Sequence, residues 1–361
     1  MKKILSLTLA VLLCLTLAAC GGANPGSTPA SSNGIATLEG HMPLLSTPES
    51  VPVESTPTES EPAESALLSE EIRVAALKGP TAMGLVWLMD NAIGEFTLAA
   101  SADEVTPKLV QGELDIAAVP ANLASVLYNN TEGQIQVLAV NTLGVLYIVE
   151  SGDTVHSVED LRGKTIYSSG KGSTPEYALQ YMLSQNGIDP ETDVTIEWKS
   201  EHSECVAALA AEENAIAMLP QPFVTTAQMK NENIRVALDL TEEWEKLSST
   251  SEEKATLITG VVVARKEFCE EHPQAVEEFL SAYEKSVDFA KNDVDGAAAL
   301  IGQYDIVPEA VAKKALPYCN ITFIKGSEMK EKLSSYLNTL FAQNPKAIGG
   351  AMPGDDFYYG G

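Results

Sequence analysis

The sequence predicts an α/β protein with two lobes, two crossover segments and a group of helices near its C-terminal end. Short apolar runs alternate with helical patterns from residue 72 onward, which is typical of parallel sheets covered by helices. The alternation restarts near residue 160 with the same order of elements. Two long apolar runs, 135–150 and 256–265, separate these parts, and we expect them to join the two lobes like the hinge of a clamshell.

The individual elements follow from the spacing of apolar residues. Short apolar runs predict buried strands, and apolar residues at helical spacing predict the helices between them. The first half is expected to contain strands over 72–77, 96–100 and 114–120 and helices over 81–92, 103–110 and 122–128. The second half is expected to contain strands over 164–170, 194–198, 215–220 and 234–240, with helices beginning near 174 and over 203–211.

The C-terminal part is predicted to be mostly helical, and it completes the first lobe. Helical segments are expected over 266–291 with a break at Pro273, and over 295–304, 308–316 and 328–343. We therefore assign 71–148 and 260–361 to the first lobe and 149–259 to the second.

The N-terminal segment predicts export. Two lysines precede an apolar stretch, Ile4 to Ala18, that is too short for an ordinary membrane-spanning helix. The stretch ends in Leu17-Ala18-Ala19-Cys20, which resembles the bacterial lipobox. This resemblance implies that 1–19 is a lipoprotein signal peptide, that cleavage precedes Cys20, and that Cys20 carries a lipid. The alternative is an ordinary secretory signal followed by an incidental cysteine.

Residues 20–70 are predicted to be a disordered tether. Between residues 21 and 70 we count seven prolines, nine serines, five threonines and seven glutamates, and no lysine or arginine. Such a segment cannot bury enough apolar surface to fold, and its prolines and like charges keep it extended. We expect it to hold the folded part away from a membrane surface.

Composition excludes several classes of partner. The formal net charge of −27 argues against nucleic acid and against an anionic membrane surface. The chain has only four arginines, so a site that grips an anion through several guanidinium groups is not expected.

The cysteines predict no metal site. Cys205, Cys269 and Cys319 remain after the signal segment and Cys20, and their spacing matches neither a metal site nor a disulfide scaffold. Three buried thiols are the favoured interpretation, and a bridge between Cys269 and Cys319 is the alternative.

These features together resemble the substrate-binding proteins of ABC importers, in particular the nitrate, taurine and alkanesulfonate group that includes binding proteins for thiamine-pyrimidine precursors. The segments that carry the resemblance lie between about residues 70 and 345; they are 76–81, 109–116, 161–166, 172–174 and 219–223. The resemblance implies a type II periplasmic-binding-protein fold, capture of a ligand by closure of two lobes, and delivery to an ABC permease and its ATPase. It implies an extracytoplasmic monomer held at a bacterial membrane by its lipid.

The candidate binding residues come from the loops that follow the strands, because ligands of open α/β sheets bind at the carboxyl ends of the strands. The segment SSGKGSTPEYALQYML, which begins at Ser168, contains glycines, a lysine and hydroxyls before a helix. It is not a nucleotide-binding loop, because glycine follows Gly170-Lys171 where serine or threonine is needed, and Thr165 occupies the position of the first glycine. Thr174 is expected to cap the helix, with Pro175 at its first position.

The other candidates were chosen by the same strand-end rule, or because a polar group interrupts an apolar run. His202 is the most suggestive histidine, although a solvated His202 beside a capping Ser203 is the alternative; Met83 and Phe223 are equally consistent with core positions. The candidate ligand-binding residues are Lys78, Gly79, Pro80, Thr81, Met83, Asn122, Asn141, Thr142, Ser169, Gly172, Ser173, Thr174, Tyr177, His202, Gln221 and Phe223.

These side chains are mostly hydroxyls, amides and aromatic rings, and they favour a small polar or heteroaromatic ligand over sulfate or phosphate. No catalytic residue, metal site or cofactor is predicted, and only His202 with Glu201 and Glu204 would make an acid–base set. The predicted function is therefore solute binding for an ABC importer. The alternatives are a ligand-sensing lipoprotein that presents the same fold to a signalling partner, and an enzyme of the same fold class.

Overall fold

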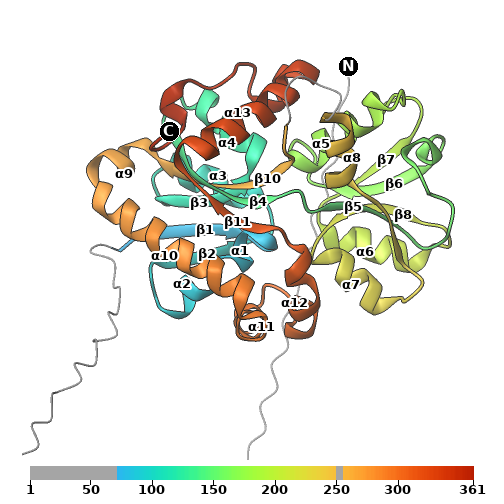
Figure 1. Ribbon diagram of the computed structural model, residues 1–361, viewed down its shortest axis with the longest axis horizontal. Coiled ribbons are helices and arrows are strands. Elements are labelled where there is room, and N and C mark those ends of the chain that lie inside the picture. Colours follow the sequence, from blue (N-terminus) through green and yellow to red (C-terminus); the bar gives the residue numbers. More distant parts are fainter. Residues whose placement is uncertain (1–70, 249–254) are drawn as a thin grey trace, which may run out of the picture. The chain divides into compact units, whose positions relative to one another are not determined.

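The strands of the protein form two separate sheets (Figure 1). The computed structural model describes residues 71–248 and 255–361. One sheet has six strands in the order β11-β4-β10-β3-β1-β2, and the other has five in the order β7-β6-β8-β5-β9. We call the part built on the six-stranded sheet the first lobe and the part built on the five-stranded sheet the second lobe. The predicted α/β fold class with two sheets and many helices is confirmed.

The elements of the first lobe come from both ends of the described chain. They are β1 (Arg73–Leu77), α1 (Pro80–Met83), α2 (Val86–Asp90), β2 (Glu95–Ala99), α3 (Ala102–Val110), β3 (Ile116–Pro120), α4 (Ala121–Asn130), β4 (Ile135–Leu143), β10 (Ile258–Arg265), α9 (Lys266–Glu271), α10 (Pro273–Asn292), α11 (Val294–Gln303), α12 (Glu309–Ala315), β11 (Ile321–Ile324) and α13 (Gly326–Gln343). Four 3₁₀ turns occur in the described chain, and three of them belong to this lobe: η2 (Leu316–Tyr318), η3 (Pro345–Ile348) and η4 (Asp355–Phe357).

The second lobe is a continuous segment. It contains β5 (Leu146–Glu150), η1 (Val158–Leu161), β6 (Thr165–Ser169), α5 (Thr174–Gln185), β7 (Thr195–Lys199), α6 (His202–Ala211), β8 (Ile216–Pro220), α7 (Phe223–Lys230), β9 (Arg235–Asp239) and α8 (Leu240–Ser248).

Each sheet is mixed, whereas the sequence predicted a parallel one. The strands β1, β2 and β3 run parallel in the first lobe, as do β6, β7 and β8 in the second. The strands that follow a crossover run antiparallel to them: β10 pairs antiparallel with β3 and β4, and β5 pairs antiparallel with β8 and β9. The reason is the path of the chain, because a crossover strand enters its sheet from the side where the parallel strands end.

The first crossover divides the apolar run 135–150 into two strands that belong to different sheets. The run bends at Gly144, where the carbonyl accepts a hydrogen bond from the side chain of Asn320. A Cβ atom at Gly144 would overlap the side chain of Thr241 in the second lobe, so only glycine fits this position. A long apolar run predicts a strand but does not say where the strand leaves its sheet.

Four further parts of the chain differ from the sequence prediction. The segment 81–92 forms two short helices, α1 and α2, separated at Gly84, where a side chain would press against Ile321. Strand β11 and the helices α7 and α8 were not predicted. Helix α7 has eight residues and β11 has four, so neither gives a strong periodic signal, whereas α8 is amphipathic and its apolar spacing is typical of a helix.

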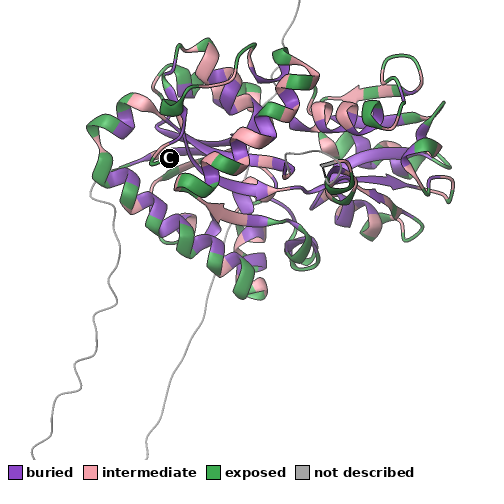
Figure 2. Ribbon diagram, turned by 45° about the horizontal axis from the view of Figure 1, so that its top comes forward, coloured by how far each residue is buried: buried purple, intermediate pink, exposed green. Residues whose placement is uncertain are grey.

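Buried residues fill the sheets and the inner faces of the helices, and exposed residues lie on the outer helix faces (Figure 2). Cys205, Cys269 and Cys319 are buried free thiols, as favoured from the sequence. Burial raises the pKa of Cys205 to about 11. Among the described residues, no helix is long and apolar enough to span a membrane. The predicted signal peptide, Cys20 and the tether lie outside the described residues.

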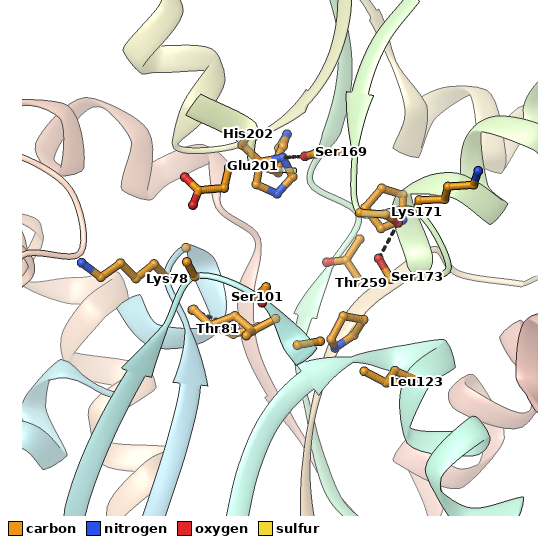
Figure 3. Close-up of a pocket in the computed structure, with 18 of the residues that line it drawn as sticks. Lys78, Thr81, Ser101, Leu123, Ser169, Lys171, Ser173, Glu201, His202 and Thr259 are labelled. Atoms are coloured by element: carbon orange, nitrogen blue, oxygen red, sulfur yellow. Dashed lines mark hydrogen bonds between the residues drawn. The ribbon is translucent and has the colours of Figure 1, made fainter. Parts of the chain in front are cut away.

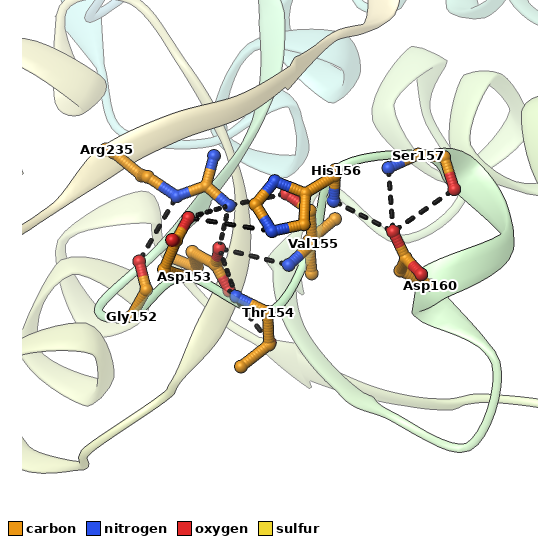
Figure 4. A network of polar contacts seen from close by, with 9 residues as sticks. Gly152, Asp153, Thr154, Val155, His156, Ser157, Asp160 and Arg235 are labelled. Atoms are coloured by element: carbon orange, nitrogen blue, oxygen red, sulfur yellow. Dashed lines mark hydrogen bonds and ion pairs between the residues drawn. The ribbon is translucent and has the colours of Figure 1, made fainter.

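A buried carboxylate holds the loop that follows β5 (Figure 4). Glu150 is fully buried, and its oxygens accept hydrogen bonds from the amides of Thr154 and Val155 at 2.9–3.1 Å. Arg235 on β9 pairs with Glu150 and also donates to the carbonyls of Gly152 and Val155. Burial opposes ionisation, but the donated hydrogen bonds and Arg235 together lower the pKa of Glu150.

We expect Glu150→Gln to lower the free energy of unfolding at neutral pH by about 1.5–3 kcal/mol, the usual contribution of hydrogen bonds to a charged group. Because the folded-state pKa of Glu150 is lowered, its stabilising effect is present above the unfolded-state pKa. It is lost as the pH falls through the folded-state value. In urea unfolding, the difference in the free energy of unfolding between wild type and variant should therefore become smaller as the pH is lowered.

Asp153→Asn is the matched control, because Asp153 contacts the same Arg235 at 3.2 Å but its side chain is 79% exposed. An exposed ion pair contributes little, so this variant should unfold like the wild type at every pH. Equal effects of the two substitutions would contradict the role assigned to Glu150.

Candidate functional site

A cavity of about 400 Å³ lies between the lobes, at the carboxyl ends of their parallel strands (Figure 3). Its walls include residues at or just after the ends of β1, β2 and β3 in the first lobe and of β6, β7 and β8 in the second. Thr142, Val145, Leu146 and Thr259 from the crossover segments complete it. The double crossover thus turns six strand ends toward one space.

Nine of the sixteen candidate residues line this cavity. They come from the turn after β1, from the first crossover, from the turn before α5 and from the start of α6. These residues are Lys78, Gly79, Pro80, Thr81, Thr142, Ser169, Gly172, Ser173 and His202.

Three candidates with a large side chain, Met83, Tyr177 and Phe223, do not line the cavity. Met83 is fully buried in the first-lobe core, and Tyr177 packs against the core beside α5. Phe223 lies behind the imidazole of His202, with ring centres 4.9 Å apart. The helical spacing of these residues does not distinguish a core position from a cavity wall.

The four remaining amide and hydroxyl candidates make buried contacts within the protein. The side chain of Gln221 accepts a hydrogen bond from Thr225, and that of Asn141 accepts one from Thr142. Asn122 and Thr174 bond to each other across the lobes. Satisfaction is incomplete in one of these cases, because the amide nitrogen of Asn141 is buried without a hydrogen-bond partner among the described residues.

Several cavity residues were not among the candidates. Ser101 and Asp103 follow β2, so the same strand-end rule would have selected them. Lys171, Lys199, Ser200 and Glu201 are neighbours of candidates in the chain. Thr259 lies in β10, where its hydroxyl interrupts an apolar run, so the rule that selected Asn141 and Thr142 would have selected it as well.

Helices α1 and α4 begin at the cavity wall without an acidic residue in their first turns, and three further helices that begin there share one arrangement. Helices α3, α5 and α6 have N-caps at Ser101, Ser173 and Glu201, so Thr174 and Ser203 are not the caps that the sequence suggested. Each helix carries a glutamate three positions after its cap, and this carboxylate accepts hydrogen bonds from the turn: Glu104 from Ala100 and Ser101, Glu176 from Gly172, and Glu204 from Ser200. These carboxylates offset the positive ends of the helix dipoles.

The lysines of the cavity wall are directed away from its centre. The ammonium of Lys78 donates to the carbonyl of Asp305 at 2.8 Å, and that of Lys199 pairs with Glu197 at 3.1 Å. Figure 3 shows the side chains of Lys78 and Lys171 pointing outward on opposite sides. Asp103 and Glu201 also line the cavity. Little fixed positive charge therefore faces a ligand.

Most hydroxyl groups of the wall donate their protons to protein acceptors. Thr81 donates to the carbonyl of Leu77, Ser101 to Glu104, Thr142 to Asn141, Ser173 to the carbonyl of Gly170, and Thr259 to the carbonyl of Leu143, over 2.6–3.3 Å. A hydroxyl that has donated its single proton retains oxygen lone pairs that accept hydrogen bonds. The wall therefore presents acceptors.

His202 is the aromatic residue of the cavity wall. Its Nδ1 lies 2.5 Å from the hydroxyl oxygen of Ser169, and its ring points into the cavity (Figure 3). Burial disfavours the charged ring and lowers the pKa of His202 to about 4. The ring is neutral at physiological pH.

This arrangement can bind a ligand. The pair Ser169 and His202 resembles a nucleophile and its base, yet no carboxylate of the described residues hydrogen-bonds the ring as an orienting third group. No cluster of metal-binding side chains occurs among the residues that the structure describes.

We expect the imidazole resonances of His202 to titrate with a midpoint near pH 4. Because its pKa is lowered in the folded state, the unfolded state binds more protons below about pH 6.5, and stability falls as the pH drops from there toward 4. His202→Gln should remove this part of the acid destabilisation in urea unfolding. A midpoint near 6.5 in the folded wild type would contradict the assigned burial.

Comparisons with known proteins agree with this arrangement. Residues 92–306, more than half of the chain, match the family described as ABC transporter, phosphonate, periplasmic substrate-binding protein. Among curated proteins, none matches the sequence.

Solved structures share the fold at low sequence identity. An ABC transporter protein from Parabacteroides distasonis is similar with a TM-score of 0.66 and 21% identity, over 80% of this chain and 98% of that one. The aliphatic sulphonate binding protein SsuA of Escherichia coli has a TM-score of 0.62 and 15% identity, over 80% and 92%. The nitrate-binding protein NrtA of Synechocystis PCC 6803 has a TM-score of 0.52 and 14% identity, over 67% and 68%.

The strand-end cavity is formed by the same type of fold that these binding proteins have, and the family match extends across parts of both lobes. The chain belongs to the ABC transporter phosphonate periplasmic substrate-binding protein family, and it is the substrate-binding component of an ABC importer.

Proposed function

We propose that the protein captures a small polar ligand, rich in hydrogen-bond donors, in the cavity between its lobes and delivers it to an ABC permease. The family consists of substrate-binding proteins rather than enzymes and acts outside the cytoplasm. The observation that carries the ligand class is the wall of hydroxyl oxygens whose protons are already donated to the protein. Such a wall favours ligand N–H and O–H groups as partners.

The charge of the wall argues in the same direction. Glu104, Glu176 and Glu204 offset the three helix ends, and Asp103 and Glu201 add negative charge. Asp103 and Glu201 line the cavity, whereas the ammonium groups of Lys78 and Lys199 are paired with Asp305 and Glu197, so a dianion would find little positive charge among the described residues to balance it. The family name refers to phosphonate, and the two neighbours named above bind sulphonate and nitrate. For this chain the wall supports a ligand with a neutral or positively charged group. A single anionic group of the ligand would lie near Lys78 or Lys171, whose side chains point outward (Figure 3).

A heteroaromatic ligand fits within this class if it carries amino groups. Among the described residues that line the cavity, His202 is the one with an aromatic ring, because Phe223 and Tyr177 lie elsewhere. An aminopyrimidine would donate hydrogen bonds from its amino group to the hydroxyl oxygens and would stack its ring on His202. The cavity wall therefore supports hydrogen-bond donors on the ligand more strongly than it supports stacking of a ligand ring.

Capture requires that the ligand bind one arrangement of the lobes better than another. A ligand that contacts both walls shifts an equilibrium between more open and more closed arrangements, and the two crossover segments are the natural hinge.

Isothermal titration of the protein against a panel of small ligands tests the ligand class. We expect an amino-substituted pyrimidine of the thiamine-precursor type, or another compound with several N–H donors, to bind more tightly than methylphosphonate, methanesulfonate or nitrate. Ligand binding should also compact the protein in small-angle scattering. Binding of a small dianion alone would overturn the proposed class, and saturating ligand without compaction would overturn the closure.

Replacing one hydroxyl of the wall tests its role as an acceptor. Thr81→Val should weaken the tightest ligand of the panel about threefold to tenfold, the effect of losing one hydrogen bond. Thr226→Val is the matched control, because Thr226 donates to the carbonyl four residues before it in the same way but does not line the cavity. Equal affinities of the two variants would contradict the contact.

We also propose that the protein is anchored through a lipid on Cys20 and that residues 20–70 connect this anchor to the lobes. The lipobox-like Leu17-Ala18-Ala19-Cys20 supports this. A lipid anchor adds about 0.8 kcal/mol of membrane affinity for each buried methylene group. Expressed in a bacterium, the wild-type protein should incorporate labelled palmitate and sediment with membranes. Cys20→Ser should do neither, and a lipid-free wild-type protein would overturn the anchor.

A further inference from the structure

Asn122 makes hydrogen bonds to both lobes at once. It lies in the first turn of α4 and is fully buried. Its amide nitrogen donates to the carbonyl of Ala347 in η3 at 2.9 Å and lies 3.4 Å from the carbonyl of Gly172 in the second lobe. Its amide oxygen accepts a hydrogen bond from the hydroxyl of Thr174, the first residue of α5, at 3.2 Å.

The second-lobe partners of Asn122 flank the turn that lines the cavity. Gly170, Lys171, Gly172 and Ser173 are all part of the wall, and Thr174 follows them directly. The side chain of Asn122 does not itself line the cavity. It therefore contacts the back of the ligand-facing turn from the opposite lobe.

Helix α13 supports this connection from behind. The hydroxyl of Tyr336 lies 3.5 Å from that of Thr174, and its ring packs near Trp244 of α8 with ring centres 5.7 Å apart. Trp244 in turn packs on Tyr181 of α5 at 4.5 Å. Thr174 is thus held in a buried setting in which an unpaired hydroxyl or amide is costly.

We propose that Asn122 is a positioning residue that fixes the turn Gly170–Ser173 of the second lobe against the first lobe and so sets the width of the cavity without touching the ligand. Loss of its side chain frees the turn and leaves Thr174 without its acceptor in the first lobe. The lobes then separate more readily on this side of the cavity, while the contact of Tyr147 with the carbonyl of Tyr318 remains.

Two substitutions remove the connection from opposite sides. Asn122→Ala removes the first-lobe partner, and Thr174→Val removes the second-lobe hydroxyl with little change of shape. Thr174→Ser retains the hydroxyl and should restore wild-type behaviour. Ser125→Ala is the matched control, because Ser125 is a buried residue of the same helix that also bonds the C-terminal segment, at Ile348, but has no bond to the second lobe.

The test measures the distance between the lobes in the ligand-free full chain. Nitroxide labels are placed at Val110→Cys and Met229→Cys, two exposed positions on α3 and α7. Double electron–electron resonance measures the distance between the labels, and the buried thiols of Cys205, Cys269 and Cys319 stay unlabelled. Asn122→Ala and Thr174→Val should shift and broaden the distribution toward longer distances. Thr174→Ser and Ser125→Ala should leave it unchanged. Wild-type distributions in both Asn122→Ala and Thr174→Val would overturn the proposal.

Hydrogen exchange separates positioning from general loss of stability. In Asn122→Ala the peptide that contains 170–176 should exchange about threefold to tenfold faster, as expected for one lost hydrogen bond, while peptides of β6 and β8 keep wild-type rates. Faster exchange throughout the second lobe would show a purely structural role and would contradict the proposal. If Asn122→Ala does not fold, Thr174→Val provides the same comparison.

Discussion

The double crossing of the chain between two sheets is the constraint on which the site depends. Parallel strands present their carboxyl ends and the starts of the following helices at one edge of a sheet. Because β4 leads into β5 and α8 leads back to β10, the two edges face each other across one cavity. The crossing is tight: only a glycine fits beside Thr241 at position 144, and a side chain at Gly260 would collide with Asn141 and Thr81.

The tight crossing also explains why polar residues occur in apolar strands. Asn141 and Thr142 lie at the end of β4, where a fully apolar strand would be expected to continue. Thr142 reaches the cavity, and Asn141 accepts its proton from behind. One residue faces the ligand and its neighbour determines which hydrogen-bonding group is offered. Ser169 likewise contacts the ring nitrogen of His202, but here both side chains line the cavity.

The sequence predicted the fold well because its strongest signals are local. Strands such as 72–77 and 215–220 are apolar runs, and the order of elements repeats, so two α/β lobes follow from pattern alone. The strand-end rule likewise found the turns at Lys78–Thr81 and Ser169–Ser173. Which side of a turn a residue faces depends on packing between distant segments. Asn122 meets Ala347, and Phe223 lies behind His202; neither contact leaves a periodic signal in the sequence.

The distribution of charge connects the cavity with the chain as a whole. The formal charge of −27 gives the protein a negative field that repels anions before they reach the cavity and attracts cations. Behind the cavity wall, Glu104, Glu176 and Glu204 act in the same sense at short range, since they accept hydrogen bonds from amides of wall residues that an oxyanion would otherwise use. A binding protein for a dianion would need lysine or arginine to oppose both effects, and here Lys78 and Lys199 are paired with Asp305 and Glu197. The electrostatic field of the whole protein and the contacts at the cavity wall therefore favour the same kind of ligand, one that brings hydrogen-bond donors rather than negative charge.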